Sequence, residues 1–153
     1  MKETKTASVK KKERKMLYPM FGMIALSGLV VILLYGSRFI LISQVVSSGK
    51  GLERAKHADE TRPHLPGVFR NITDNYNHIF EQPTLFYAVV IYLHLVNQGD
   101  EANVMLAWGY VIARLAHSII QITINHVPLR IMFFVVSGFC LLAMIVREVL
   151  RLL

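Results

Sequence analysis

Apolar segments alternate with short polar segments along this chain of 153 residues. Met16 to Ser37 is free of charged residues and, as a helix rising 1.5 Å per residue, crosses a bilayer core of about 30 Å. Ile131 to Val146 is a second charge-free run, and Thr84–Val96 and Val104–Ala113 are apolar segments with polar ends. The pattern predicts an all-α integral membrane protein, a bundle of four spanning helices at about 17–46, 72–96, 102–124 and 128–150.

Glycine and proline residues divide these helices. The polar stretch from Ser47 to Asn71 contains several of both and is expected to be a loop. We expect the second helix to start near Ile72, with Asn71 or Thr73 as its cap, and to continue through a kink at Pro83. In an up-and-down bundle, the start of the second helix, the end of the third and the start of the fourth then share one side of the membrane.

Composition narrows the class of protein further. A hydrophobic content of 54% and a mean hydropathy of +0.44 exclude an ordinary soluble domain, and Cys140 alone allows no intrachain disulfide. Much of the net charge of +7 falls in residues 1–15, a predicted polar, disordered tail before a membrane domain at 16–153. Basic residues beside a membrane helix more often set orientation or contact anionic lipid, so we expect the lipid bilayer and no nucleic acid as a partner.

Four polar residues interrupt the third apolar helix at spacings of three, four and four: Arg114, His117, Gln121 and Asn125. At 100° per residue they form one narrow stripe on the helix surface. An ionisable residue at membrane depth is costly and usually faces a partner or a cavity rather than lipid. The stripe therefore marks the place where a site is expected.

Glu81 and Arg114 lie at similar depth, roughly 13–17 Å from their helix ends at 1.5 Å per residue, and we expect them to form a buried ion pair. The pair has two interpretations: a wall of a polar pocket, or a purely structural link that keeps two helices in register. His78, Glu81 and His117 could converge, but Arg114 beside them disfavours a cation, so no metal site is expected. Arg130 lies near the interface, where its guanidinium either reaches lipid headgroups or stabilises a thiolate or carboxylate.

Two regions carry a family resemblance. The segment Asp74–Pro83 with Leu85–Tyr87, and the segments Leu106–Trp108 and Arg114–Ser118 with Asn125 and Arg130, resemble the membrane-associated proteins in eicosanoid and glutathione metabolism (the MAPEG family), particularly its bacterial branch. The similarity is good over roughly 58–134 and extends to the whole chain in hydropathy. Its signature is a set of polar residues at fixed offsets inside membrane helices.

The resemblance implies a homotrimer with glutathione bound between subunits and a bacterial inner-membrane location. It also implies that Arg130 assists thiolate chemistry and that six further residues belong to the glutathione site: Glu81, Arg114, His117, His126, His78 and Gln121. The implied activity is a glutathione-dependent transferase or peroxidase acting on lipophilic electrophiles. His78, Gln121 and His126 depart from the usual family residues, so an alternative stays open: a non-catalytic membrane protein whose polar core only specifies helix packing and assembly.

Overall fold

The regular structure of the described residues is entirely α-helical. The computed structural model describes residues 15–47 and 65–153, so the predicted basic tail and most of the predicted loop at 47–71 lie outside the described residues. The helices are α2 (Leu17–Ser47), α4 (Gly67–Glu81), α5 (Pro83–Leu95), α6 (Glu101–Ile122) and α7 (Val127–Leu152). The prediction of an all-α fold is confirmed.

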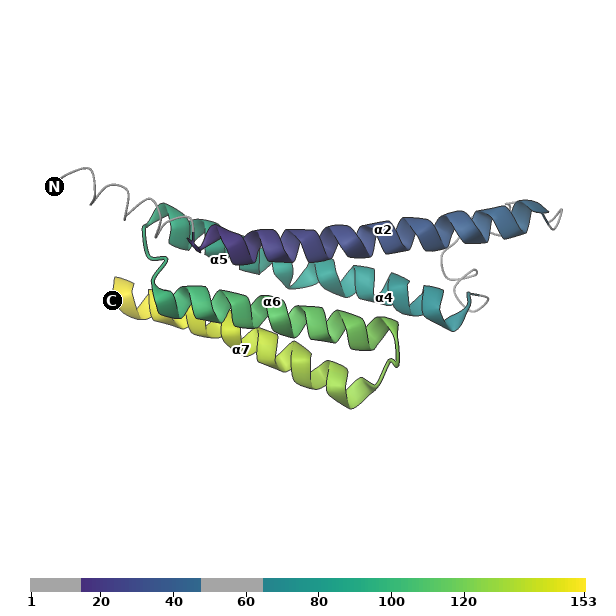
Figure 1. Cartoon of the computed structure of the whole chain (residues 1–153). Helices are drawn as coiled ribbons and strands as arrows, with labels where there is room; N and C mark the ends of the chain where they lie inside the picture. The colour runs from purple at the N-terminus through teal and green to yellow at the C-terminus, as the bar shows by residue number, and fades with distance from the viewer. Residues whose placement is uncertain (1–14, 48–64) are drawn as a thin grey trace.

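These helices form a four-helix bundle, because α4 and α5 follow one another end to end along a single side of the molecule (Figure 1). The long helix α2 lies beside the α4–α5 pair, and α6 and α7 form an antiparallel hairpin that packs against them. The start of α4, the end of α6 and the start of α7 gather at one end of the bundle, as the up-and-down arrangement predicts.

The helices α4 and α5, which together we call the second rod of the bundle, differ from the expected single helix at 72–96. The first part of the rod, α4, begins at Gly67 directly after Pro66, and no side chain caps it. The Thr73 hydroxyl donates to the Phe69 carbonyl at 2.9 Å, one turn back within the helix, so it cannot cap a helix that starts later. Gln82 separates α4 from α5, because Pro83 lacks the N–H that would continue the helical hydrogen bonds.

Three helices, α2, α6 and α7, are long and apolar enough to cross a membrane on their own. The α4 and α5 pieces have 15 and 13 residues, and end to end they exceed the 22 residues of α6. Large apolar side chains stand exposed along α2 and α7, among them Phe39 at 75% and Phe139 at 66%. A hydrocarbon environment explains this exposure, since water would penalise so large an apolar surface.

The buried core joins α2, α5, α6 and α7 near the end of the bundle where α6 begins. Phe86 and Tyr110 stack almost parallel there, with ring centroids 4.2 Å apart. Met23 and Met144 are fully buried around them. This core fixes α5 against α6 and so sets the position of the break between α4 and α5, which lies next to Phe86 along the chain.

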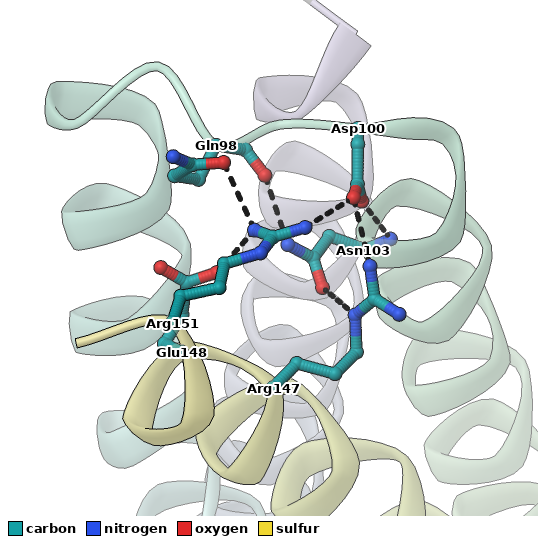
Figure 2. A network of polar contacts seen from close by, with 6 residues as sticks. All are labelled: Gln98, Asp100, Asn103, Arg147, Glu148 and Arg151. Atoms are coloured by element: carbon teal, nitrogen blue, oxygen red, sulfur yellow. Dashed lines mark hydrogen bonds and ion pairs between the residues drawn. The ribbon is translucent and has the colours of Figure 1, made fainter. Parts of the chain in front are cut away.

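Six residues form a terminal charge cluster where the α5–α6 turn meets the end of α7 (Figure 2): Gln98, Asp100, Asn103, Arg147, Glu148 and Arg151. Asp100 caps α6, because its Oδ1 accepts from the Asn103 N–H at 2.8 Å. Its Oδ2 accepts from Arg147 Nη2 at 2.7 Å and from Arg151 Nη2. Burial alone would raise the pKa of Asp100, but the hydrogen bonds from Asn103 and Arg151 and the two arginine charges hold it below its ordinary value of 3.8.

Replacing Asp100 should separate its two roles. Asp100→Asn keeps a capping oxygen and loses two ion pairs, so we expect the free energy of unfolding to fall by about 1 kcal/mol. Asp100→Ala also loses the cap and should cost about 2 kcal/mol. Because the pKa is lowered on folding, the ion pairs stabilise the fold above the ordinary pKa and this stabilisation is lost as the pH falls through the folded value.

Both effects can be measured by unfolding the detergent-solubilised protein, thermally or with a denaturing detergent. The measurement is made near neutral pH and at about pH 3. The gap between the wild type and Asp100→Asn should narrow at the lower pH. Equal stability of the wild type, Asp100→Asn and Asp100→Ala near neutral pH would contradict this account of the terminal charge cluster.

Candidate functional site

The break between α4 and α5 is held by a side chain from another helix. The last turn of a helix leaves carbonyl groups without helical donors, and Pro83 removes one further N–H at this point. Arg114 of α6 donates from Nη2 to the His78 carbonyl, and Thr84 Oγ1 donates to the Glu81 carbonyl at 2.7 Å. The break in the second rod and the arginine in the third helix are thus parts of one arrangement.

Arg114 is buried to 1% exposure, although it lies in the middle of a membrane-spanning helix. Its Nη1 donates to Gln82 Oε1 at 3.4 Å, and the same amide oxygen accepts from Ser137 Oγ of α7 at 3.2 Å. The guanidinium carbon lies 5.7 Å from the centre of the Phe134 ring, within the range of a cation–π interaction. Arg114 therefore connects α4, α6 and α7 through neutral partners.

The predicted buried ion pair between Glu81 and Arg114 is wrong. The Glu81 side chain is 66% exposed and its Oε2 lies 3.4 Å from His78 Nδ1 on the same helix. Glu81 and Gln82 share a depth but differ by about 100° in direction around the helix axis. Gln82 continues the inward-facing line of α4 and takes the place beside Arg114 that depth alone assigned to Glu81.

A second set of contacts lies one turn further along α6. His117 Nδ1 lies 2.9 Å from the backbone carbonyl of Arg130 and must carry the hydrogen there, since a carbonyl oxygen only accepts. On the other edge of the ring, Nε2 lies 3.0 Å from Gln121 Oε1. Gln121 in turn accepts from Asn75 Nδ2 of α4 at 3.2 Å. These contacts join α4, α6 and the first turn of α7.

Arg130 stands at the edge of this arrangement, partly exposed on the first turn of α7. Its Nη1 donates to Asn125 Oδ1, and Asn125 Nδ2 donates to Asn71 Oδ1 at 3.0 Å. Asn125 lies beyond the end of α6 with a φ of 48°, so the last member of the predicted stripe belongs to the turn rather than to the helix. The buried Nε of Arg130 has no hydrogen-bond partner among the described residues.

The arginines of the terminal charge cluster and the arginines of the predicted site differ in their partners. At the terminal charge cluster, Arg147 and Arg151 are both paired with carboxylates. Within residues 15–47 and 65–153, the contacts of Arg114 and Arg130 are with carbonyl and amide oxygens, and no carboxylate pairs with either. Arg114 and Arg130 therefore carry positive charges whose direct hydrogen-bond partners are neutral, an arrangement suited to an anion.

Comparison with known proteins places this arrangement in a family. The model of the MAPEG family matches residues 18–150, nearly the whole chain. The chain belongs to the MAPEG family. No curated protein and no solved structure matches it significantly. Membership and three apolar spans together make it an integral membrane protein.

In this MAPEG protein the seven predicted site residues fall into three groups. Arg114, His117 and Gln121 are buried together on one face of α6. Arg130 and His78 are partly exposed beside them, and the His78 and His117 rings meet edge to face with centroids 6.3 Å apart. Glu81 and His126 are exposed, Glu81 at the end of α4 and His126 at the cap position of α7.

The sequence analysis missed two residues that the structure brings into this region, Asn75 and Gln82. Both are neutral amides that contact buried members of the site, Asn75 through Gln121 and Gln82 through Arg114. A signal was available, because Asn75, His78 and Gln82 are spaced by three and four and so form an inward-facing stripe on the second helix. We call this stripe together with Arg114, His117, Gln121 and Ser137 the central polar cluster.

Proposed function

We propose that this MAPEG protein binds glutathione and uses its thiol against lipophilic electrophiles, as a transferase or as a peroxidase. The observation that carries the proposal is the Arg130 guanidinium, partly exposed next to the central polar cluster and without a carboxylate partner in the described part of the chain. A fixed cation of this kind lowers the pKa of a nearby thiol and stabilises the thiolate.

The donor set suits an anionic tripeptide. The side chains of Arg130 and His78 are partly exposed and that of His126 is exposed, so all three can donate to a ligand. Bound glutathione supplies the nucleophilic sulfur. In this scheme Arg130 faces the negative charge, while His117 and Arg114 maintain the backbone of α7 and the break in the second rod. Gln121, at 0% exposure, contributes from the interior.

The surroundings support a homotrimer with a lipid-facing entrance. Asn77, Glu81 and Thr84 are exposed on the outer face of α4 and α5, at a depth where polar groups next to hydrocarbon are costly. A second copy of the chain covering this face would remove that cost and extend the site. The apolar faces of α2 and α7 favour an electrophile that arrives through lipid. The proposed location, a bacterial inner membrane, rests on the resemblance to the bacterial branch alone.

A non-catalytic role is the second candidate, and one observation favours it. Arg114, Asn75 and Gln82 bond other protein groups, so the central polar cluster already serves to fix helix packing. A protein that uses polar residues only for assembly would need the same contacts. It would have no need of the uncompensated charge on Arg130.

Glutathione binding separates the two candidates. Full-length protein in detergent should bind glutathione saturably in the millimolar range or below and conjugate a generic aryl halide. S-methylglutathione should compete for binding without supporting conjugation, because it lacks the free thiol. The mass of the complex, measured in the same preparation, should correspond to three chains. An assembled protein that binds no glutathione at millimolar concentration would exclude the transferase and leave the packing role.

A further inference from the structure

A continuous series of hydrogen-bonded groups runs from the interior of α4 to the backbone of α7. Asn75 Nδ2 donates to Gln121 Oε1 at 3.2 Å, Gln121 Oε1 lies 3.0 Å from His117 Nε2, and His117 Nδ1 donates to the Arg130 carbonyl at 2.9 Å. Groups from α4 and α6 therefore determine where the first turn of α7 lies. Arg130, the residue proposed to face the thiolate, is the last member of the series.

Burial decides how Gln121 and Asn75 could act. Gln121 is 0% exposed and Asn75 1%, whereas Arg130 lies partly exposed at the edge of the cluster. A ligand that reaches Arg130 from outside does not meet either amide. Any influence of these two side chains on a bound thiol must pass through the His117 ring.

The chemistry of a carboxamide suits this position. The Arg130 carbonyl requires a hydrogen on Nδ1 of His117, so Nε2 is an acceptor when the ring is neutral and a donor when it is charged. The Gln121 oxygen can accept from a charged ring, and its NH2 group, after half a turn of the amide, can donate to a neutral one. Gln121 can therefore keep the same Nδ1–H contact with Arg130 in either protonation state.

In the orientation seen in the structure, one polar atom of each amide, Gln121 and Asn75, lacks a hydrogen-bond partner among the described residues. The two atoms, Gln121 Nε2 and Asn75 Oδ1, are buried. Buried polar groups in this state are costly, and an apolar pair of the same size would avoid the cost. Their link to His117, which for Asn75 runs through Gln121, gives the two amides a role that an apolar pair could not have.

We propose that Gln121 and Asn75 are positioning residues that fix the orientation of the His117 ring, so that its Nδ1–H stays on the Arg130 carbonyl and holds the backbone of Arg130. This proposal rests on the proposed function for its effect on catalysis, but not for the state of the His117 ring. Gln121 then acts behind the glutathione site instead of contacting glutathione, and Asn75 acts one step further back.

The test combines nuclear magnetic resonance with kinetics on the full-length protein labelled with ¹⁵N-histidine. The chain has six histidines, and His117→Gln identifies the His117 ring signals by their loss. Gln121→Met and Asn75→Leu are the test variants, because both are close in size to the native residue and only remove the polar atoms. Ser27→Ala is the control: it removes a partly buried contact with the Tyr87 hydroxyl, 3.3 Å away between α2 and α5.

We expect the wild-type ring to show a fixed hydrogen on Nδ1. The Gln121→Met ring, no longer held in place, should turn away from the Arg130 carbonyl part of the time and then show both tautomers. With glutathione and an aryl halide, Gln121→Met should lower kcat about tenfold with KM for glutathione nearly unchanged, since misplacement affects the reacting geometry more than binding. Asn75→Leu should change both measurements in the same direction but less, and Ser27→Ala neither.

Unchanged His117 signals in both Gln121→Met and Asn75→Leu would overturn the proposal, whatever the kinetics. If Gln121→Met fails to fold, Asn75→Leu alone decides by the same criterion. A wild-type protein that conjugates nothing would defeat the proposed function, but the ring signals would still test the positioning of His117. A Gln121→Met variant that lost glutathione binding at unchanged kcat would instead make Gln121 a ligand and overturn the inference.

Discussion

Replacing Arg130 with alanine is expected to lower the rate of glutathione conjugation by about 100-fold, the usual cost of removing one group that stabilises a developing or resting anion. In the described residues its guanidinium contacts only the Asn125 amide oxygen, so its charge is available to a ligand. Without it, the pKa of a bound thiol should return toward the ordinary value of about 8.5, and less thiolate forms at neutral pH. Arg130→Lys keeps a charge but loses the planar fork, so an intermediate loss of about tenfold is expected.

Conjugation rates as a function of pH, together with the ultraviolet absorbance of the bound thiolate, measure this effect. Arg147→Ala is the matched control at the other end of the bundle, where the arginine is already paired with Asp100 at 2.7 Å. It should reduce stability and leave kcat unchanged. If Arg130→Ala keeps the wild-type rate and thiolate absorbance while glutathione still binds, another group stabilises the thiolate and the role assigned to Arg130 is wrong.

The helical architecture could be predicted from the sequence because hydropathy and length determine it almost directly. The apolar runs at Met16–Ser37 and Ile131–Val146 lie inside α2 and α7 with at most one residue outside. The family could be predicted as well, since polar residues at fixed offsets inside apolar helices are rare in other contexts, and the match over 18–150 confirms it. The position of the second rod was less predictable, because α4 begins five residues before Ile72 and no side-chain cap marks its start.

The contacts of the site were harder to predict, for a reason that Glu81 and Gln82 illustrate. Helical rise gives depth, but the direction of a side chain depends on the phase of the helix, which the break at Pro83 makes uncertain. Backbone acceptors add a second difficulty. Arg114 and His117 donate to the carbonyls of His78 and Arg130, and because every residue has a carbonyl group, the sequence does not indicate which one accepts. The residues of the stripe could thus be named in advance, while most of their partners could not.

Replacing Arg114 with methionine is expected to destabilise the bundle by about 2 kcal/mol, the largest loss of stability anticipated for a single substitution in the central polar cluster. Methionine fills most of the volume but leaves the His78 carbonyl and Gln82 Oε1 without the donors that Arg114 provides. The break between α4 and α5 should then loosen, because these contacts link it to α6 and lost hydrogen bonds inside a membrane protein are costly. Arg114→Lys keeps the charge but replaces the two nitrogens of the fork by one, which cannot replace both contacts, so it should lose about half as much.

Unfolding of detergent-solubilised protein by a denaturing detergent measures the free energy, and hydrogen exchange at the amides of residues 78–86 reports on the break itself. Leu115→Ala, one position along α6 but 42% exposed, is the control and should cost less than 1 kcal/mol, about a third of full burial for a leucine side chain. Gln82→Met should reproduce part of the Arg114→Met effect, since both Arg114 and Ser137 lose the same oxygen. Additive losses in the Arg114→Met, Gln82→Met double variant would contradict a shared contact, because residues that act through one hydrogen bond cost less together than the sum of their separate losses.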